Sequence, residues 1–218
     1  MKIARLAGLM FAAILAISLA VASVASAAPE FKPAEGTFTG TSGVGTLKGG
    51  SETVVCAKDT NSGTISSATL AGNVLIHFLE CTSSGATKSG CKVNSVGASE
   101  GLILTTTLHG ILGTVLGNGG GVGLLLLPIS GKRFVTLASN ECTKETAVTG
   151  DIAGLVSPTG KSQTTGKLSF TTSNKKQLIK TIDLSSGGSV EPELVAYSAT
   201  ATEETEDSIT FSKAIEVT

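Results

Sequence analysis

The two histidines of the chain, His77 and His109, are the first candidates for acid–base chemistry. An imidazole titrates near neutral pH, so a histidine beside a serine or a carboxylate is a common general base in hydrolases. His77 shares one face of an expected strand with Leu75 and Leu79, which predicts a core histidine with a satisfied hydrogen bond. His109 precedes Gly110 at the expected end of a strand, and no catalytic motif surrounds it. Neither histidine is therefore assigned a catalytic role.

Two segments rich in side-chain oxygen atoms could instead bind a cation. Residues 59–63 read Asp-Thr-Asn-Ser-Gly, which resembles the start of a calcium-binding loop, but the glycine comes one position early and position twelve is Leu70 instead of glutamate. We predict a turn between two strands there. Residues 203–207 read Glu-Glu-Thr-Glu-Asp and form the densest acidic cluster of the chain. A solvated loop before the final strand is the expected structure, and a cation-binding patch is the alternative.

Other catalytic and cofactor motifs are weak or absent. Ser173 and Lys176 have the Ser-x-x-Lys spacing of penicillin-recognising enzymes, but no helix start and no Ser-Asp-Asn partner accompany them. The chain also lacks the G-x-S-x-G motif of serine hydrolases. We therefore predict no catalytic, cofactor-binding or metal-ligating residue, and a non-catalytic protein is favoured over an enzyme.

The four cysteines, Cys56, Cys81, Cys91 and Cys142, are expected to form two disulfides. Cys81 and Cys91 flank a turn-rich stretch, which favours pairing these two and, by elimination, Cys56 with Cys142. The sequence alone allows all three connectivities. A zinc site is disfavoured, because no Cys-x-x-Cys occurs and the spacings match no zinc ribbon.

The first 27 residues have the pattern of a helical signal peptide. Lys2 and Arg5 precede an uncharged apolar run over residues 6–24, and small residues follow up to Ala27. This pattern predicts cleavage after Ala27 and export to an oxidising compartment. An uncleaved membrane anchor is the alternative, since the apolar run is just long enough to span a bilayer. We expect a secreted protein without stable membrane insertion after cleavage.

Charge and composition exclude several classes of function. Lysine and arginine total 16 against 17 acidic residues, a net charge of −1, so no basic field would attract nucleic acid. Aromatic residues make up only 4% of the chain, which disfavours sugar stacking and the aromatic girdles of outer-membrane barrels. The many Gly, Ser and Thr residues favour short strands and tight turns.

Alternation with a period of two predicts strands throughout the exported part. Residues 208–217 alternate clearly, 74–79 are apolar on both faces as in a central strand, and 102–108 read as a half-buried strand. Residues 111–116 and 122–127 read as a hairpin around Asn118. Further strands are expected at 36–48, 52–58, 64–71, 132–138, 147–156, 164–171, 177–184 and 194–202.

About a dozen short strands with short connections predict one all-β domain, an antiparallel sandwich or barrel. We assign residues 1–27 to the signal peptide, 28–35 to a flexible N-terminus of the exported chain, and 36–218 to this single domain.

The order of several short motifs resembles a group of uncharacterised secreted β-rich proteins from soil actinobacteria. The likeness extends from about Gly36 to Val217. It implies secretion and an all-β fold, and it carries no activity, cofactor or site residue. The residues that carry it are Val55 and Cys56, Gly63, residues 74–81, Cys91, residues 101–106, 108–113 and 122–124, Phe134, Cys142, residues 148–150, Pro158, residues 167–170, Gln177 and the final strand.

The leading functional hypothesis is a secreted, non-catalytic structural or interaction module, such as a cell-surface component, of unknown partner. One alternative is a carrier of a small apolar ligand, which requires a barrel cavity of about 300 Å³ or more. The other is a secreted hydrolase, which requires a carboxylate pair, or a histidine beside a serine or aspartate, in a cleft.

Overall fold

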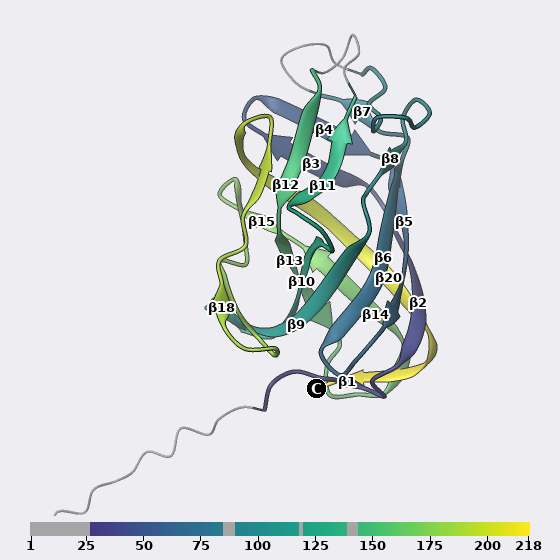
Figure 1. Cartoon of the computed structure of the whole chain (residues 1–218), viewed down its shortest axis with the longest axis vertical. Coiled ribbons are helices and arrows are strands. Elements are labelled where there is room, and N and C mark those ends of the chain that lie inside the picture. Colours follow the sequence, from purple (N-terminus) through teal and green to yellow (C-terminus); the bar gives the residue numbers. More distant parts are fainter. Residues whose placement is uncertain (1–26, 85–89, 118–119, 139–143) are drawn as a thin grey trace, which may run out of the picture.

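The computed structural model describes residues 27–84, 90–117, 120–138 and 144–218 (Figure 1). This part of the chain is all-β and contains no helix, which confirms the all-β part of the prediction. The expected signal helix and Asn118 lie outside the described residues. The strands are β1 (Phe31–Lys32), β2 (Gly36–Ser42), β3 (Gly45–Gly49), β4 (Glu52–Cys56), β5 (Lys58–Ile65), β6 (Leu70–Leu79), β7 (Thr82–Ser83), β8 (Ile103–Leu104), β9 (Leu108–Leu116), β10 (Val122–Pro128), β11 (Arg133–Leu137), β12 (Thr146–Gly150), β13 (Ile152–Ser157), β14 (Gln163–Phe170), β15 (Thr172–Ser173), β16 (Lys176–Gln177), β17 (Thr181–Leu184), β18 (Ser189–Val190), β19 (Leu194–Ala196) and β20 (Ala199–Val217).

Eight strands close into a barrel. Following the pairs around the ring gives the order β2, β5, β6, β9, β10, β13, β14 and β20, and β20 pairs with β2 again. Every one of these pairs is antiparallel. Closure removes the unpaired sheet edges that an open sheet of the same strands would expose.

A second sheet continues from one end of the barrel through the long strand β20. Its order is β11, β12, β19, β20, β3, β4 and β7. Residues 201–204 of β20 pair with β3 in this sheet, and residues 205–210 pair with β14 in the barrel. The 19-residue strand β20 therefore belongs to both, and Figure 1 shows it crossing the molecule obliquely in yellow.

The barrel core follows from strand alternation. In β20, Ile209, Ile215 and Val217 are buried, and Ser208 and Thr210, on either side of Ile209, are exposed. Phe38 of β2 faces inward and meets the ring of Phe211 edge-on at 6.4 Å. The prediction for residues 208–217 is confirmed.

A smaller apolar cluster covers the outer face of β9, β10 and β13. Leu125 of β10 and Val115 of β9 pack there against Ile182 of β17, while Leu124 and Leu126 face the barrel interior. The predicted hairpin of β9 and β10 is confirmed by the pairing of the two strands. Residues 122–127 are therefore apolar on both faces because this cluster buries the outer one, with Ile182 supplied by β17, which pairs with residues 113–116 of β9.

Several strand predictions are wrong in position or environment. The spans 36–48, 147–156, 177–184 and 194–202 were each expected as one strand, and each contains parts of two strands. The expected strand over 64–71 is a turn region between β5 and β6, which pair with each other. Residues 102–108 contain the two-residue β8 and the start of β9 instead of one strand. The outer face of residues 74–79 is open, since Leu75 is 38% exposed. Apolar residues there suggested a covered strand, and no second layer of the described chain lies over them.

The predicted disulfide pairing is also wrong. Cys56 bonds to Cys81, with the two Cα atoms 3.9 Å apart. Strands β4 and β7 are antiparallel neighbours that pair Val55 with Thr82, which brings the flanking cysteines face to face. Cys91 is disulfide-bonded as well, and Cys142 lies outside the described residues. Proximity in sequence favoured Cys81 with Cys91, but strand pairing decided the bond.

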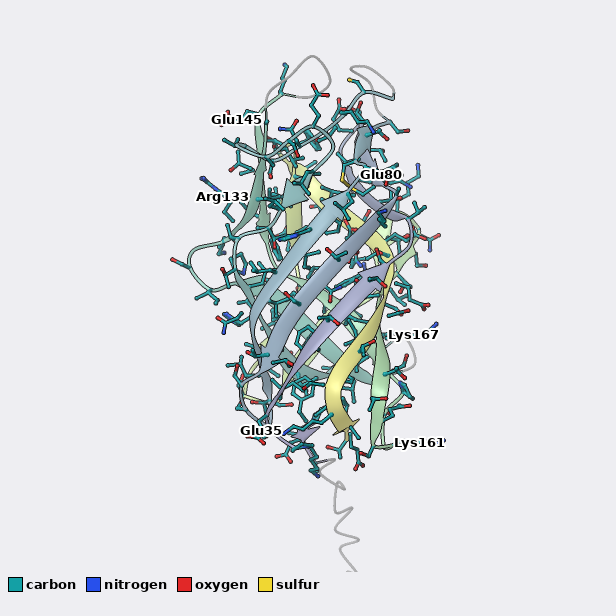
Figure 2. All side chains as sticks on the ribbon, turned by 90° about the vertical axis from the view of Figure 1, so that its right-hand side faces the viewer. Glu35, Glu80, Arg133, Glu145, Lys161 and Lys167 are labelled. Atoms are coloured by element: carbon teal, nitrogen blue, oxygen red, sulfur yellow. A yellow bond between two sulfur atoms is a disulfide. The ribbon has the colours of Figure 1, made fainter. Side chains whose placement is uncertain are left out.

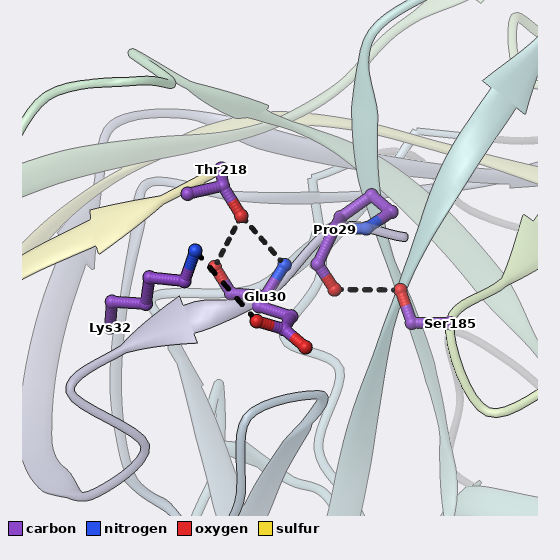
Figure 3. A network of polar contacts seen from close by, with 5 residues as sticks. All are labelled: Pro29, Glu30, Lys32, Ser185 and Thr218. Carbon is purple, nitrogen blue, oxygen red and sulfur yellow. Dashed lines mark hydrogen bonds and ion pairs between the residues drawn. The ribbon is translucent and has the colours of Figure 1, made fainter. Parts of the chain in front are cut away.

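The segment expected as a flexible N-terminus is paired with the other end of the chain. β1 pairs with the end of β20 through Phe31 and Val217, and Phe31 is buried. Figure 3 shows the surrounding contacts: the Glu30 N–H donates to Thr218 Oγ1 at 3.3 Å, and the Ser185 hydroxyl donates to the Pro29 carbonyl at 2.8 Å. Residues 29–32 thus form part of the barrel end.

Ion pairs lie on the outside of the molecule. Lys167 meets Glu206 at 2.6 Å and Lys213 meets Glu35 at 2.6 Å, and every partner is at least 40% exposed. Figure 2 shows the labelled Glu35 and Lys167 pointing outward from the barrel wall. Pairs of this kind each contribute about 0–1 kcal/mol to stability. No helix of the described residues is long and apolar enough to cross a membrane.

Candidate functional site

A group of polar side chains lies inside the otherwise apolar barrel. Asp59 and Asn61 point inward from β5, and Thr205 and Asp207 point inward from β20, with exposed fractions of 1%, 9%, 8% and 5%. Glu203 lies on the same face of β20 and is partly accessible. We call these five residues the interior polar cluster. Polar groups buried this deeply are costly, so each requires a partner.

Three side chains of the cluster are joined by hydrogen bonds. The Asn61 amide nitrogen donates to Asp207 Oδ1 at 2.7 Å and to Asp59 Oδ1 at 3.2 Å. The Asp59 backbone N–H donates to Ser42 Oγ of β2 at 3.0 Å. Strand β2 lies between β5 and β20, and Gly40 is paired with Asn61 on one side. A Cβ on Gly40 would lie 2.3 Å from Asn61 Oδ1, so this glycine leaves the space through which Asn61 reaches Asp207.

Two carboxyl groups of the cluster, those of Asp207 and Glu203, have raised pKa values. Burial, followed by the charge of Asp59 and a hydrogen bond with the Asp59 carboxyl, raises the pKa of Asp207 to about 8, although the Asn61 amide opposes this shift. Burial and then the charges of Asp59, Asp207 and Glu204 raise the pKa of Glu203 to about 8. A hydrogen bond between two carboxyl groups requires a proton on one of them. Asp207 is the residue whose raised pKa supplies that proton.

Two buried oxygen atoms of the cluster make no hydrogen bond within the described chain. They are Asn61 Oδ1 and Thr205 Oγ1. Gln163 Nε2, a nitrogen, is a third buried atom without a partner in the described chain. Gln163 is paired with Ile215, eight residues along β20 from Asp207, and it lines a cavity that Asn61 and Asp207 also line. Buried polar atoms in folded proteins nearly always have a hydrogen-bond partner. Two buried oxygen atoms without one, beside two carboxyl groups, therefore need an explanation.

Two adjoining cavities flank the cluster. One, of about 90 Å³, is lined by Asp59, Glu203, Thr205 and Asp207 among apolar side chains. The other, of about 70 Å³, is lined by Asn61 and again by Asp207. Each is well below the roughly 300 Å³ of a pocket for a drug-sized ligand. The interior therefore has room only for a small occupant. Both cavities share the apolar residues Ile76, Leu126 and Phe170.

The wall beside Glu203 is completed by a side chain. The Gln177 amide nitrogen donates to the Glu203 carbonyl at 3.0 Å, and the Glu203 N–H donates to Gln177 Oε1 at 3.1 Å. Gln177 thus pairs with β20 as a neighbouring strand would, in the gap between β19 and β14. The hairpin of β15 and β16 that carries it turns at Asn174 and Lys175, both with positive φ, as a two-residue hairpin turn requires.

Both oxygen-rich segments singled out in the sequence come together here, and both were assigned the wrong structure. Residues 59–63 lie within strand β5 instead of a turn, and residues 203–207 lie within β20 instead of a solvated loop. The signal that could have found the cluster is their period of two. Alternate residues Asp59 and Asn61, and Glu203, Thr205 and Asp207, share one face when the segments are read as strands.

The remaining sequence candidates lie elsewhere. His77 is exposed on the outer face of β6 and is paired with Thr60, so the predicted core histidine is wrong. The face of β6 that carries His77 points outward, because Val74 and Ile76 lie on the opposite face and line the barrel interior. His109 lies in β9 opposite Leu127. Ser173 and Lys176 pair across the β15–β16 hairpin, which explains their spacing without catalysis.

The outer wall behind the cluster carries rows of hydroxyl groups. Thr39 of β2 is paired with Ser62 and Thr210, and Thr41 is paired with Thr60 and Ser208. We call these six exposed residues the hydroxyl face. Together with Leu75 and His77 they line a shallow depression of about 360 Å³.

Among the described residues, no group of three or more His, Cys, Asp or Glu could hold a metal ion. No family model matches the chain, and no curated protein or solved structure is significantly similar to it.

Proposed function

We propose that the protein is a non-catalytic binding module that acts outside the cytoplasm and holds a small molecule inside its barrel. The observation that carries this proposal is the interior polar cluster, whose buried Asn61 and Thr205 oxygens have no partner and lie beside two adjoining cavities. A buried site with strongly shifted carboxyl groups is a typical position for function.

The compartment is argued from the covalent framework. The Cys56–Cys81 disulfide is typical of proteins outside the reducing cytoplasm. The proposal includes secretion after cleavage behind Ala27. The resemblance to secreted actinobacterial proteins supports this part of it.

The site favours binding over turnover. The Asp59–Asp207 carboxyl pair is the kind of group that a hydrolase would use. However, both residues are at least 95% buried, and the cavity beside them, of about 90 Å³, is too small to admit a polymer with a scissile bond. The same volume disfavours a carrier of a large apolar ligand.

A panel of small compounds tests this function. Neutral, cationic and anionic molecules of a few heavy atoms are titrated into the oxidised protein, and the melting temperature and the NMR signals of interior residues are recorded. We expect at least one chemical class to bind, with the Asn61 side-chain amide signal shifting. Absence of binding in every class, or steady turnover of a hydrolase substrate, would contradict the proposal.

A second candidate function is contact with a surface through the hydroxyl face. Its regular rows of Thr and Ser offer neutral donors and acceptors over a shallow depression. Such a face suits a partner that forms hydrogen bonds and carries no net charge. Replacing Thr39 and Thr60 with lysine should abolish retention on the cell surface, whereas the same change at exposed Thr164 of β14 should leave it intact.

A further inference from the structure

We propose that the occupant of the barrel interior is a small organic amine, bound as an ammonium ion with an apolar body of a few carbon atoms. This inference rests on the proposed binding function and names the chemical class of the ligand. It starts from the two unpaired atoms of the interior polar cluster, which are both oxygens. Thr205 Oγ1 and Asn61 Oδ1 lie at least nine-tenths buried beside the carboxyls of Asp59 and Asp207.

The cluster has more acceptors than donors. The Asn61 amide nitrogen already donates to both carboxyls, at 2.7 Å and 3.2 Å. A carboxylate only accepts, and an ammonium group supplies three donors and no acceptor. An ammonium ion therefore matches what the cluster lacks, whereas an anion would meet like charge and a further carboxylic acid would add acceptors.

The charge of the cluster also suits a monovalent cation. In the free protein the raised pKa of Asp207, whose carboxyl is hydrogen-bonded to that of Asp59, favours a proton on Asp207 at neutral pH. An ammonium ion can replace that proton, so that the net charge of the barrel interior stays constant while one proton leaves to solvent. Glu203 is the other titratable side chain that lines the first cavity, and Lys167, which is exposed, lines the second. The nearby Glu204 is exposed. A metal ion fits less well, because no three acidic residues here are grouped for one.

The walls of the cavities suit the apolar part of such a ligand. Phe78, Phe134 and Phe170 line the first cavity, and Ile76 and Leu126 separate it from the second. Aromatic rings attract cations through their faces and also bury alkyl groups. An apolar cavity of about 150 Å³ holds benzene, which sets the scale of the largest body that two such small spaces admit.

The test compares n-butylamine with n-butanol, which has nearly the same shape and no charge. Both are titrated into the full exported chain with its disulfides intact, by calorimetry in two buffers of different ionisation enthalpy. We expect the amine to bind at least about tenfold more tightly than the alcohol, because charge-assisted hydrogen bonds are stronger than neutral ones. Binding at about pH 7 should release close to one proton per site.

Variants locate the site. Asp207→Asn, which keeps the shape of the side chain, should abolish the preference for the amine and the proton release. Thr205→Val is a second variant that removes one unpaired oxygen and should weaken amine binding several-fold. Glu206→Gln is the matched control, since Glu206 is the neighbouring residue of β20 and faces outward toward Lys167; it should bind like the parent protein.

Two results would overturn the inference. Equal binding of butanol and butylamine would show that the barrel binds a ligand of another class, and the proposed binding function would then survive. The same conclusion would follow if a neutral or anionic compound of the panel binds but butylamine and its shorter and longer homologues do not. Failure of every class would instead remove the proposed function itself.

Discussion

At the residue scale, the acidic group of Asp207 makes stability depend on pH. Its pKa rises from 3.8 to about 8 on folding, so between these values the folded protein holds a proton that the unfolded chain lacks. Stability from this group is therefore complete below about pH 4 and is lost as pH rises through about 8. Glu203 acts in the same direction, since its pKa is also raised to about 8.

Asp207→Asn should flatten this dependence. Urea unfolding at about pH 5, 7 and 9 should show the parent protein losing stability across the series, by up to a few kcal/mol, while the variant changes less. Glu206→Gln serves as control, because pairing with Lys167 lowers the pKa of Glu206 and its effect has the opposite sign. A parent protein that gains stability toward pH 9 would contradict the buried, protonated carboxyl.

Gly40→Ala, although Gly40 is not a member of the interior polar cluster, should disrupt that cluster. The new methyl group would lie 2.3 Å from Asn61 Oδ1 and 2.7 Å from Ile209 Cδ1, so Asn61 must move away from Asp207. We expect a loss of about 1–3 kcal/mol in unfolding free energy, typical of overpacking. Gly43→Ala is the control, because a Cβ there meets nothing within 4 Å. Equal stability of the two variants would show that the interior rearranges without strain.

At the scale of elements, the side chain of Gln177 replaces a missing strand. Gln177→Ala leaves the N–H and C=O of Glu203 without their partners at 3.1 Å and 3.0 Å. Unpaired buried backbone groups cost about 1–3 kcal/mol each, so thermal unfolding should occur at lower temperature. Lys176→Ala, at the exposed neighbouring position, should have little effect. Hydrogen exchange of the Glu203 amide would report the opening directly, and unchanged protection would contradict this role.

The disulfide between β4 and β7 connects two short elements of the second sheet. Peptide mapping of the oxidised protein should yield Cys56 linked to Cys81. Replacing Cys56 and Cys81 together with serine should cost about 2–4 kcal/mol of stability. A fragment linking Cys81 to Cys91 would disprove the pairing.

Many of the strands could be predicted from the sequence, and some could not. Period-two patterns identified the hairpin of β9 and β10 and the alternation of residues 208–217, since burial of one face imposes that pattern directly. The predictions for the polar strand segments 59–63 and 203–207 were wrong, because the residues of these segments that face inward are themselves polar. Propensity then indicates turns and loops, and only barrel closure, which no local pattern encodes, places Asp59 beside Asp207.

At the scale of the whole molecule, β20 couples the barrel to the second sheet. The same strand pairs with β3 at residues 201–204 and with β14 and β2 beyond them. The interior polar cluster occupies the part of β20 where it passes from one sheet to the other. Occupation of the cluster should therefore raise the unfolding temperature of both parts together, and a single cooperative transition in calorimetry would agree with this coupling.

The pairing of β1 with the end of β20 places both ends of the described chain at one pole, with the Thr218 N–H donating to the Glu30 carbonyl at 3.0 Å. Figure 1 shows this pole opposite the one that carries β4 and β7. A short peptide could join the two ends into a continuous ring, and new ends could be cut elsewhere on the surface. Likewise, a carrier or dye attached at either end would stand at the same pole, leaving the disulfide pole and the hydroxyl face accessible.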